Sequence, residues 1–525
     1  MNEEILNTIR EKGLMLEKEV FDLVKSFGDV SIAKSFLENI ERNSGQKMIT
    51  KSVLGNNVAV VKNFVNKLEN ENKEIVEKTF VKLGLSMEVT HEREVRDVKK
   101  EDNEKDLGYK IFYADTLPDR KLEVKDFVGN FRARYQELQR ILMNRQELQN
   151  NLVSINKISG NRQSLSIIGI VKEKRVTKNK NLIITFEDLT GEISALVKFD
   201  NQEIFEKASE LQLDDVVGVK ASGNNDLLFV HDIFFPDSFI DQKVSFDEDY
   251  NIVFLSDLHT GSEMHLRENF ERFLDWLNSD EEEAKKIKYI FFTGDNVDGV
   301  GIFPGQEDVL DLKSMEEQYE LVSYYMKRIP KDKTIFMCPG QHDATRVAEP
   351  QPVINKKYAP GLYEIENLVL VTNPTMVKLL EGEKELKILM YHGASLHSII
   401  NEVKELRLMK AHHCPAKAVK HLLKRRHLAP SHSAVVYIPH PEKDPLVISE
   451  VPDIICTGEI HRPDIENYNG VLIMTGSCWQ SQTPFEEKVG NLPDPAKVTL
   501  FNVNSRQIKI LDFSDENSVK GDDEE

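Results

Sequence analysis

Short apolar segments in the second half of the chain run directly into loops that carry carboxylate or imidazole side chains. The five segments are NIVFL, KYIFF, TIFMC, ILM and DIIC, which begin at residues 251, 288, 334, 388 and 453. The side chains that follow them are Asp257, His259, Asp295, His342, Asp343, His392, Glu459 and His461. Aspartate and histidine are suitable ligands for Mn²⁺, Fe and Zn²⁺, so the set favours a metal site.

These loops are expected to meet at one place in the fold. If the five segments are strands that lie side by side in a sheet, their ends bring the polar side chains to one edge. That edge is where α/β proteins usually bind their ligands. The pattern therefore predicts a single site built from loops far apart in the sequence.

The residue types indicate a pair of divalent ions rather than a serine hydrolase. No G-x-S-x-G nucleophile elbow precedes a helix in this half of the chain. Asp257 and His259 are two residues apart and can point the same way from a strand end, where they would chelate one ion. Asp295 has two carboxylate oxygens and can bridge two ions at the usual spacing of about 3.5–4 Å.

The loops resemble the signature of the calcineurin-like metallophosphoesterases. That signature runs D-x-H, G-D-x-x-D/N, G-N-H-D/E, a lone His and G-H-x-H. The matching elements occur here in the same order, at residues 257–259, 294–298, 340–343, 392 and 458–461. The resemblance implies that Asp257, His259 and His461 hold a first metal and that Asp295 bridges to a second.

The second metal's positions depart from that signature. The resemblance places Gln341, His392 and Glu459 there, but the family has asparagine where this chain has Gln341 and histidine where it has Glu459. Glutamine keeps a carbonyl ligand, and glutamate is a harder donor that suits Mn²⁺ or Mg²⁺ better than zinc. We therefore expect two divalent ions, manganese first, with Fe, Zn or Mg as alternatives. The other interpretation is a weakened or vacant second site with little hydrolysis.

The resemblance also implies two residues that act on the leaving group. His342 lies where the family keeps a histidine that assists the departing oxygen, and Asp343 could orient its ring and keep it protonated. Asp298 is expected as a helix N-cap, a support for a ligand or a catalytic group. His265 and His397 lie near motifs but are expected to be surface or packing residues.

Three further segments resemble the small subunit of archaeal family D DNA polymerase. They are GVGIFPGQ from residue 299, KRRHLAP from 424 and CWQSQTPF from 478. The resemblance implies a metal-dependent 3′–5′ exonuclease that acts on single-stranded or mispaired DNA ends. It also implies a large polymerising subunit as partner and, through the complex, the sliding clamp. The alternatives are a scaffold subunit with little activity and a stand-alone repair nuclease or phosphatase.

The elements that must position these residues predict a multidomain α/β protein. Residues 1–80 have helical periodicity, and 81–126 are charged enough to form a flexible linker. A helix and five β-type runs over 127–244 predict a small barrel, best matched by an OB-fold, with a β-sandwich as the alternative. Strands alternate with helices over 245–515, as in an α/β sandwich, here the phosphoesterase sandwich of the resemblance, and 516–525 form an acidic tail.

Composition limits the classes of function that fit. The chain has 525 residues and a formal net charge of −20, so any DNA contact must be local or shared with a partner. Its four cysteines are scattered singly, which excludes a zinc knuckle or a redox pair. With no signal-like N-terminus and no apolar run of bilayer length, a cytoplasmic protein is expected, and the resemblance implies an archaeal cell.

One segment offers local positive charge. Residues 404–432 contain eight lysines or arginines and a single acid, Glu405. This segment either guides a DNA strand or is simply a solvated helix face. The histidines within it are expected to be surface or packing residues, and Trp479 and Phe485 are expected in the core or at a subunit interface.

Overall fold

The computed structural model describes residues 108–117, 121–149, 151–489 and 491–514, together with scattered positions between 9 and 49. The chain forms two compact units, residues 1–103 and 104–525, each described by itself. In the first unit, β1 (Met15–Leu16) pairs in parallel with β2 (Met48–Ile49). Most of the predicted helical domain, and the predicted acidic tail, lie outside the described residues.

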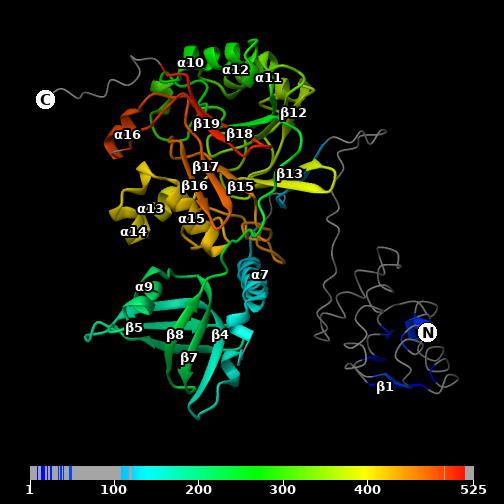
Figure 1. Ribbon diagram of the computed structural model, residues 1–525, viewed down its shortest axis with the longest axis vertical. Helices are drawn as coiled ribbons and strands as arrows, with labels where there is room; N and C mark the ends of the chain where they lie inside the picture. Colours follow the sequence, from blue (N-terminus) through cyan, green and yellow to red (C-terminus); the bar gives the residue numbers. More distant parts are fainter. Residues whose placement is uncertain are drawn as a thin grey trace. The chain divides into compact units, whose positions relative to one another are not determined.

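Two six-stranded sheets form the centre of the second unit (Figure 1). The first has the order β12-β11-β10-β9-β18-β19, in which β9 to β12 are parallel to one another. Its strands are β9 (Asn251–Leu255), β10 (Ile287–Thr293), β11 (Thr334–Cys338), β12 (Leu368–Leu370), β18 (Lys497–Asn502) and β19 (Ile508–Asp512). The NIVFL segment is buried at every position, as expected for a strand covered on both faces.

The second sheet has the order β16-β17-β15-β14-β13-β3. Its strands are β3 (Tyr109–Tyr113), β13 (Thr375–Glu381), β14 (Lys384–Met390), β15 (Ile454–Thr457), β16 (Asp464–Tyr468) and β17 (Val471–Thr475). The edge strand β3 falls within the range 81–126 that the charge pattern assigned to a flexible linker. That assignment is wrong for Tyr109–Tyr113, because their backbone pairs antiparallel with β13, a partner distant in sequence.

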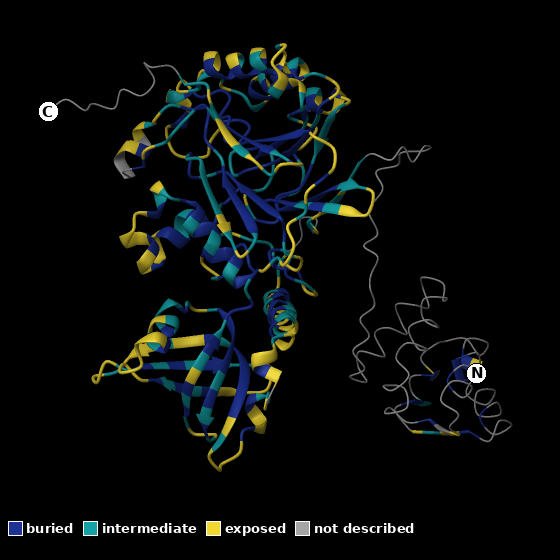
Figure 2. Ribbon diagram, in the orientation of Figure 1, coloured by how far each residue is buried: buried dark blue, intermediate teal, exposed yellow. Residues whose placement is uncertain are grey.

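Helices cover the outer faces of both sheets. On the first sheet lie α10 (Arg267–Leu277), α11 (Glu282–Lys285) and α12 (Met315–Arg328), and on the second α13 (Leu396–Glu402), α14 (Lys404–Leu408) and α15 (Ala416–Arg425). A third apolar cluster, with Phe254, Phe291 and Ile388, lies between the sheets. The result is a four-layer sandwich whose strands are buried and whose helices expose their outer faces (Figure 2).

The five chemistry-bearing segments do not lie in one sheet. NIVFL, KYIFF and TIFMC form β9, β10 and β11 of the first sheet, whereas ILM and DIIC lie in β14 and β15 of the second. The expectation of a single sheet edge is therefore wrong in detail. Because the two sheets pack face to face, the ends of both can still deliver their loops to one place.

A closed five-stranded barrel precedes the sandwich in the sequence, so the barrel interpretation is confirmed over the β-sandwich. Its order is β4-β5-β6-β8-β7, with β7 pairing back to β4 and a parallel contact between β6 and β8. The strands are β4 (Gln163–Val176), β5 (Leu182–Glu187), β6 (Glu192–Val197), β7 (Val216–Gly223) and β8 (Leu228–Phe234). A helix that the sequence reasoning missed, α9 (Gln202–Glu210), separates β6 from β7.

Helix α7 (Val124–Met143) lies between the barrel and the sandwich (Figure 1). Its apolar side packs on the barrel through Leu138 and Leu142. Its Arg134 donates to Asp444 of the sandwich at 2.7 Å, and both side chains are almost fully buried. Removing one partner of such a buried pair leaves an uncompensated charge, so α7 ties the two domains together.

The basic segment 404–432 is also used inside the protein. Arg425 makes a two-pronged contact with Asp215 of the barrel at 2.7 and 3.0 Å, and Lys424 reaches Glu210. Arg426 donates to main-chain carbonyls, and Lys417 and Lys420 face Glu466. These cations are therefore largely paired, which favours the structural interpretation of the segment over a DNA path.

No helix in the described part of the chain is both long and apolar enough to span a bilayer.

Candidate metal centre

Five residues of the predicted site adopt left-handed backbone conformations. They are Asp257, His259, Asp295, Glu459 and His461, with φ between 46° and 72°. Residues with side chains rarely adopt this region, and each such position costs free energy that the surrounding structure must offset. Strain gathered in the loops after β9, β10 and β15 marks them as a functional site.

Glycines in the motifs allow these loops to approach closely. A Cβ atom on Gly340 would lie 2.2 Å from Asp295 Oδ1, and one on Gly458 would lie 2.5 Å from Asp257 Oδ2. Any other residue at either position would displace a carboxylate of the site. The glycines of the G-Q-H-D and G-E-I-H motifs are therefore required by contact.

Asp295 lies at the centre of the cluster. Its Oδ2 atom is 3.2 Å from His392 Nε2, 3.9 Å from His342 Nε2 and 4.0 Å from His259 Nε2. Its Oδ1 accepts a hydrogen bond from the backbone N–H of His342 at 2.9 Å. One carboxylate oxygen surrounded by three imidazoles is the arrangement that a bridging ligand needs.

The first group of candidate ligands consists of Asp257, His259 and His461. The Nε2 atoms of the two histidines face each other at 3.1 Å, and His461 Nε2 is 3.6 Å from Asp257 Oδ1. The Nδ1 atom of His259 faces Asp298 at 3.2 Å, and that of His461 faces Glu486 at 2.9 Å. If each Nδ1 carries the proton, two Nε2 lone pairs point at one another, which is favourable only around a cation.

A second group of candidate ligands joins Asp295 and His392 with Asp257, and Glu459 lies beside His392. The Nδ1 atom of His392 faces the carbonyl oxygen of Thr293 at 2.9 Å, so Nδ1 carries the proton. In the neutral ring its Nε2 is then a lone pair, 3.2 Å from Asp295 and 3.0 Å from Glu459 Oε2, and this buried atom has no hydrogen-bond partner among the described residues. Acceptors that converge without a donor again fit a cation. Both groups therefore fit the divalent ions that the sequence predicts.

The charges of the cluster act in the same direction. Burial by itself would raise the pKa of Asp295, but His392 and His342 hold it well below its usual range. Burial would lower the pKa of His392, yet the neighbouring Asp295 carboxylate raises it well above normal. The buried carboxylates thus favour positive charge at their centre, and a divalent ion is one way to supply it.

Gln341 is placed beside the cluster. Its side chain is half-buried and lines a cleft together with His342. Its amide makes no hydrogen bond to any residue that the structure describes. The sequence-predicted role of Gln341 as a ligand of the second metal therefore remains a prediction.

His342 lies between the cluster and the cleft, where a group that serves the leaving oxygen is expected. Its Nε2 faces Asp295, and its Nδ1 lies 2.6 Å from the main-chain carbonyl of Asp298. That carbonyl, rather than the carboxylate of Asp343, orients the ring. The sequence-based role of Asp343 as the orienting group is wrong.

Asp343 is instead a buried structural group. Its carboxylate accepts hydrogen bonds from the Tyr319 hydroxyl at 2.7 Å, from the backbone and side chain of Asn296 and from the Gly340 N–H. Burial and the nearby Asp295 raise its pKa to about 6. Asp343 joins the loops that follow β10 and β11, which fixes the position of His342 indirectly.

The structure reveals supports that the sequence reasoning did not assign. Asp298 accepts from Gln306 Nε2 at 2.9 Å and from Gln480 Nε2 at 3.0 Å while it faces His259. Of the three roles expected for Asp298, the structure favours support of a ligand. Gln306 and Gln480 belong to two of the segments that carry the polymerase-subunit resemblance, which was an available signal that they serve the site.

Other expectations are resolved by packing. Trp479 is fully buried among Phe270 and Phe273, so it is a core residue. The side chain of Phe485 lies outside the described residues. His265 packs against Tyr325, as expected for a packing residue. His397, by contrast, reaches the cluster, where its Nε2 is 3.7 Å from Glu459 Oε1.

Residues 252–465 match the protein family described as the B subunits of DNA polymerases alpha and epsilon. Over 398 residues the chain is 36% identical to the DNA polymerase II small subunit of Methanothermobacter thermautotrophicus, covering 75% of this chain and 80% of that protein. The counterpart from Pyrococcus horikoshii is 31% identical over 95% of this chain and 80% of its own length. The counterpart from Pyrococcus furiosus is 35% identical over 74% of this chain and 64% of its own length.

Proposed function

Because the chain belongs to the family of DNA polymerase II small subunits, we propose that it gives the polymerase a metal-dependent 3′–5′ exonuclease. Its substrates would be single-stranded or mispaired DNA ends. A large subunit would polymerise DNA in the same cytoplasmic complex and present those ends to this chain. Any contact with the sliding clamp would be made through that complex. The sandwich would be a calcineurin-like phosphoesterase domain, and the barrel, with a helix between its third and fourth strands, an OB-fold.

The convergence of buried carboxylates and imidazoles on two positions is the observation that carries the proposal. Asp257, His259 and His461 would hold a first ion, and Asp295 would bridge. His392, Glu459 and Gln341 would hold the second. When bound, two divalent ions neutralise the charge of a phosphodiester and acidify a water molecule that attacks the phosphorus.

The chain's own residues would complete the reaction. Attack on the phosphorus breaks the bond to the 3′-oxygen of the preceding nucleotide and releases a nucleoside 5′-monophosphate. His342 is aligned by the Asp298 carbonyl through Nδ1, so a protonated ring presents Nε2–H toward the cluster. That proton would pass to the departing 3′-oxygen. Asp343 would contribute by holding the His342 loop against that of Asp295.

A second candidate function is a scaffold subunit with little hydrolysis. Two observations favour it: Glu459 replaces an imidazole of the resembling family, and the Gln341 amide makes no hydrogen bond to the described residues of the cluster. In that case the first metal group would serve stability, and the barrel and sandwich would mainly grip the large subunit. The two candidates differ in whether a second ion binds and whether DNA is degraded.

The deciding experiment uses the chain purified alone and with its large subunit. Bound Mn, Fe and Zn are measured by elemental analysis, and degradation of a 5′-labelled single strand is followed beside Asp295→Ala and His342→Ala. The proposal expects up to two ions and 3′ degradation that both variants lose. If the wild type is active, the His342→Ala variant should keep its full metal content, whereas the Asp295→Ala variant should lose metal. A wild type that degrades DNA no faster than the variants would overturn the nuclease in favour of the scaffold.

A further inference from the structure

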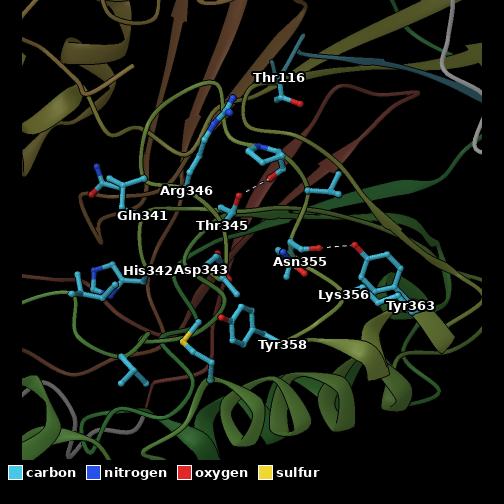
Figure 3. Close-up of a pocket in the computed structure, with 18 of the residues that line it drawn as sticks. Thr116, Gln341, His342, Asp343, Thr345, Arg346, Asn355, Lys356, Tyr358 and Tyr363 are labelled. Atoms are coloured by element: carbon cyan, nitrogen blue, oxygen red, sulfur yellow. Dashed lines mark hydrogen bonds between the residues drawn. The ribbon is translucent and has the colours of Figure 1, made fainter. Parts of the chain in front are cut away.

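A cleft of about 750 Å³ lies beside the metal centre (Figure 3). His342 and Gln341 form its end nearest the cluster. The rest of its wall comes from the loop after β11 and from two other loops, with Thr116, Val300, Ile302, Arg346, Asn355, Lys356, Tyr358 and Tyr363 among the lining residues. A volume of this size falls in the range of about 300–1,000 Å³ that is usual for small-molecule sites, which is room for a nucleoside.

The charge of this cleft differs from that of the whole protein. Lys356 is a cation of the wall, Arg346 is a second whose guanidinium donates to the carbonyls of Leu117 and Pro350, and Asp343 is the single carboxylate among the described residues that line the cleft. Asp343 is 4% exposed, with its oxygens occupied by neighbouring donors. In a chain of net charge −20, this lining is locally positive and attracts a phosphate backbone.

The cleft also offers surfaces on which a base can stack. Tyr363 is 41% exposed, and its hydroxyl donates to the Ile354 carbonyl at 2.6 Å, which holds the ring in place. The ammonium group of Lys356 lies 5.5 Å from the centre of that ring. Val300 and Ile302 are also about two-fifths exposed and add apolar surface. Aromatic rings beside cations are the usual means of binding single-stranded nucleic acid.

We propose that this cleft binds an unpaired DNA strand, specifically the nucleoside on the 5′ side of the scissile phosphate. The inference rests on the proposed nuclease function, because His342 belongs both to the cluster and to the cleft wall. A phosphodiester held at the cluster with its 3′-oxygen toward His342 directs the departing nucleoside into the cleft. The basic segment 404–432, whose cations are largely paired, is not needed for this path.

The test compares a DNA substrate with a diester that has no nucleosides. Tyr363→Ala and Lys356→Ala are assayed on a single-stranded oligonucleotide and on bis(p-nitrophenyl) phosphate, with Lys331→Ala, an exposed lysine paired with Glu366, as control. The two cleft variants should lose about tenfold in kcat/KM on DNA and remain within about twofold on the small diester. A substrate with an abasic penultimate nucleotide should be cleaved more slowly than normal DNA by the wild type. The Tyr363→Ala variant should cleave the two substrates at the same rate.

Two results would overturn the cleft assignment: equal losses on both substrates, or no loss on either. Oligonucleotide binding is also followed by fluorescence anisotropy in the presence of a chelator, where no cleavage occurs. If the wild type cleaves neither substrate but the cleft variants still weaken binding, the nuclease fails and the cleft assignment stands.

A separate observation concerns Glu459, which replaces a histidine of the resembling family. Its Oε2 faces His392 and the second metal position at 3.0 Å, whereas its Oε1 faces His397 Nε2 at 3.7 Å. Glu459 is 11% exposed and His397 is 39% exposed at its side chain, so His397 approaches from the rim of the site. The imidazole of His397 therefore lies beside Glu459, the position at which the phosphoesterase signature has a histidine.

A second histidine extends the contact. His397 Nδ1 lies 3.3 Å from His412 Nε2 in the short turn Ala411–His413. In the tautomer in which His412 donates from Nε2, His397 accepts at Nδ1. A donor at that position leaves His397 with its own proton on Nε2, directed at Glu459. Catalytic contacts that are long without ligand commonly shorten once the ligand binds.

We infer that His397 is a positioning residue for Glu459. Its Nε2 lies toward Oε1, which leaves Oε2 as the oxygen directed at the second metal position, and the contact with His412 would fix the tautomer. A carboxylate whose other oxygen is held in this way offers the ion a single donor atom, as the missing imidazole would. Supports of this kind typically change metal affinity by about 10–100-fold when removed.

The test measures metal affinity without DNA. His397→Ala should weaken the second ion by about tenfold or more and leave the first unchanged, as read by Mn²⁺ titration calorimetry and electron paramagnetic resonance. His413→Ala, the adjacent exposed histidine, is the matched control. In a Glu459→His background the imidazole is restored, so His397→Ala should have little further effect.

The same loss in both backgrounds, or a loss no larger than that of His413→Ala, would overturn the inference. So would a wild type that binds a single ion. A wild type that binds two ions through this pair yet degrades no DNA would overturn the proposed nuclease alone.

Discussion

The two halves of the metal cluster differ in what holds their imidazoles. In the first half, His259 and His461 are each backed by a buried carboxylate, Asp298 and Glu486. In the second half, His392 is backed by a main-chain carbonyl, and Glu459 is backed by the half-exposed His397. Carboxylate supports raise the basicity of the ligand and lock its orientation, so the first half is the better prepared for an ion.

The difference indicates which half of the cluster can change its ligands. In the first half, Asp298 is held by Gln306 and Gln480 from segments that carry the polymerase-subunit resemblance, whereas the second half carries both departures from the phosphoesterase signature. A preorganised half can retain its ion while the other half tunes the reaction or loses it. Five changes would break or sharpen this contrast, and they follow from the largest expected effect to the smallest.

Removing Asp295, the carboxylate that both halves would share, should weaken both halves and so abolish the difference between them. Asp295→Ala is expected to reduce nuclease activity by roughly 10²–10³-fold or more, because charge stabilisation at both ions is lost. Metal content should fall to one ion or fewer by elemental analysis. Asp200→Ala, an exposed aspartate of the barrel, is the control and should match wild type. Two retained ions would show that Asp295 does not bridge.

Removing a support of the first half should weaken that half alone. Asp298→Ala leaves His259 Nδ1 without its carboxylate, and the affinity of the first ion should fall by about 10–100-fold. Gln306→Ala, which removes one donor to Asp298, should have a smaller effect in the same direction. Calorimetric titration with Mn²⁺ checks both. Equal weakening of the two ions would contradict the separation of the halves.

Stepwise removal of metal should expose the difference directly. Dialysis against increasing chelator is expected to release the second ion first, at about tenfold lower chelator concentration, because its ligands lack carboxylate supports. Activity should be lost with that first release, while most of the metal in the first half remains. Simultaneous loss of both ions would mean that the halves bind with equal affinity.

Restoring the imidazole should change which metal the second half prefers. Glu459→His replaces a hard carboxylate donor with a nitrogen donor, so the ratio of zinc to manganese affinity should rise severalfold, on the order of three to ten. The first ion serves as the internal control, since its ligands are unchanged. An equal change at both ions would point to a general rearrangement of the loop after β15.

Restoring the shorter amide should have the smallest effect. Gln341→Asn keeps a carbonyl oxygen, so affinity for the second ion should change by about threefold or less. A rise would indicate that the longer side chain of Gln341 holds its oxygen away from the ion. A large fall, measured in the same titration, would instead show that glutamine fits this site better than asparagine.

Local pattern was sufficient for the elements and for the ligand loops. The five barrel strands and the segments before Asp257, Asp295 and His392 were predictable because apolar runs bounded by turn residues form strands whatever their partners. The order of the signature elements indicated the candidate ligands because their spacing within each loop is short. The roles of Asp298 and His397 could not be read in this way, since a side chain's partner is set by folding.

By itself, the sequence determined which strands form, which loops carry the candidate ligands and which family the chain resembles, because these depend on residues close together in the chain. Only the tertiary structure decided that the strands divide between two sheets and that Tyr109–Tyr113 join one of them. It also decided that Arg425 pairs with the barrel and that His397 reaches Glu459. Each of these joins groups far apart in sequence, and burial and charge pairing select such partners only after the layers pack.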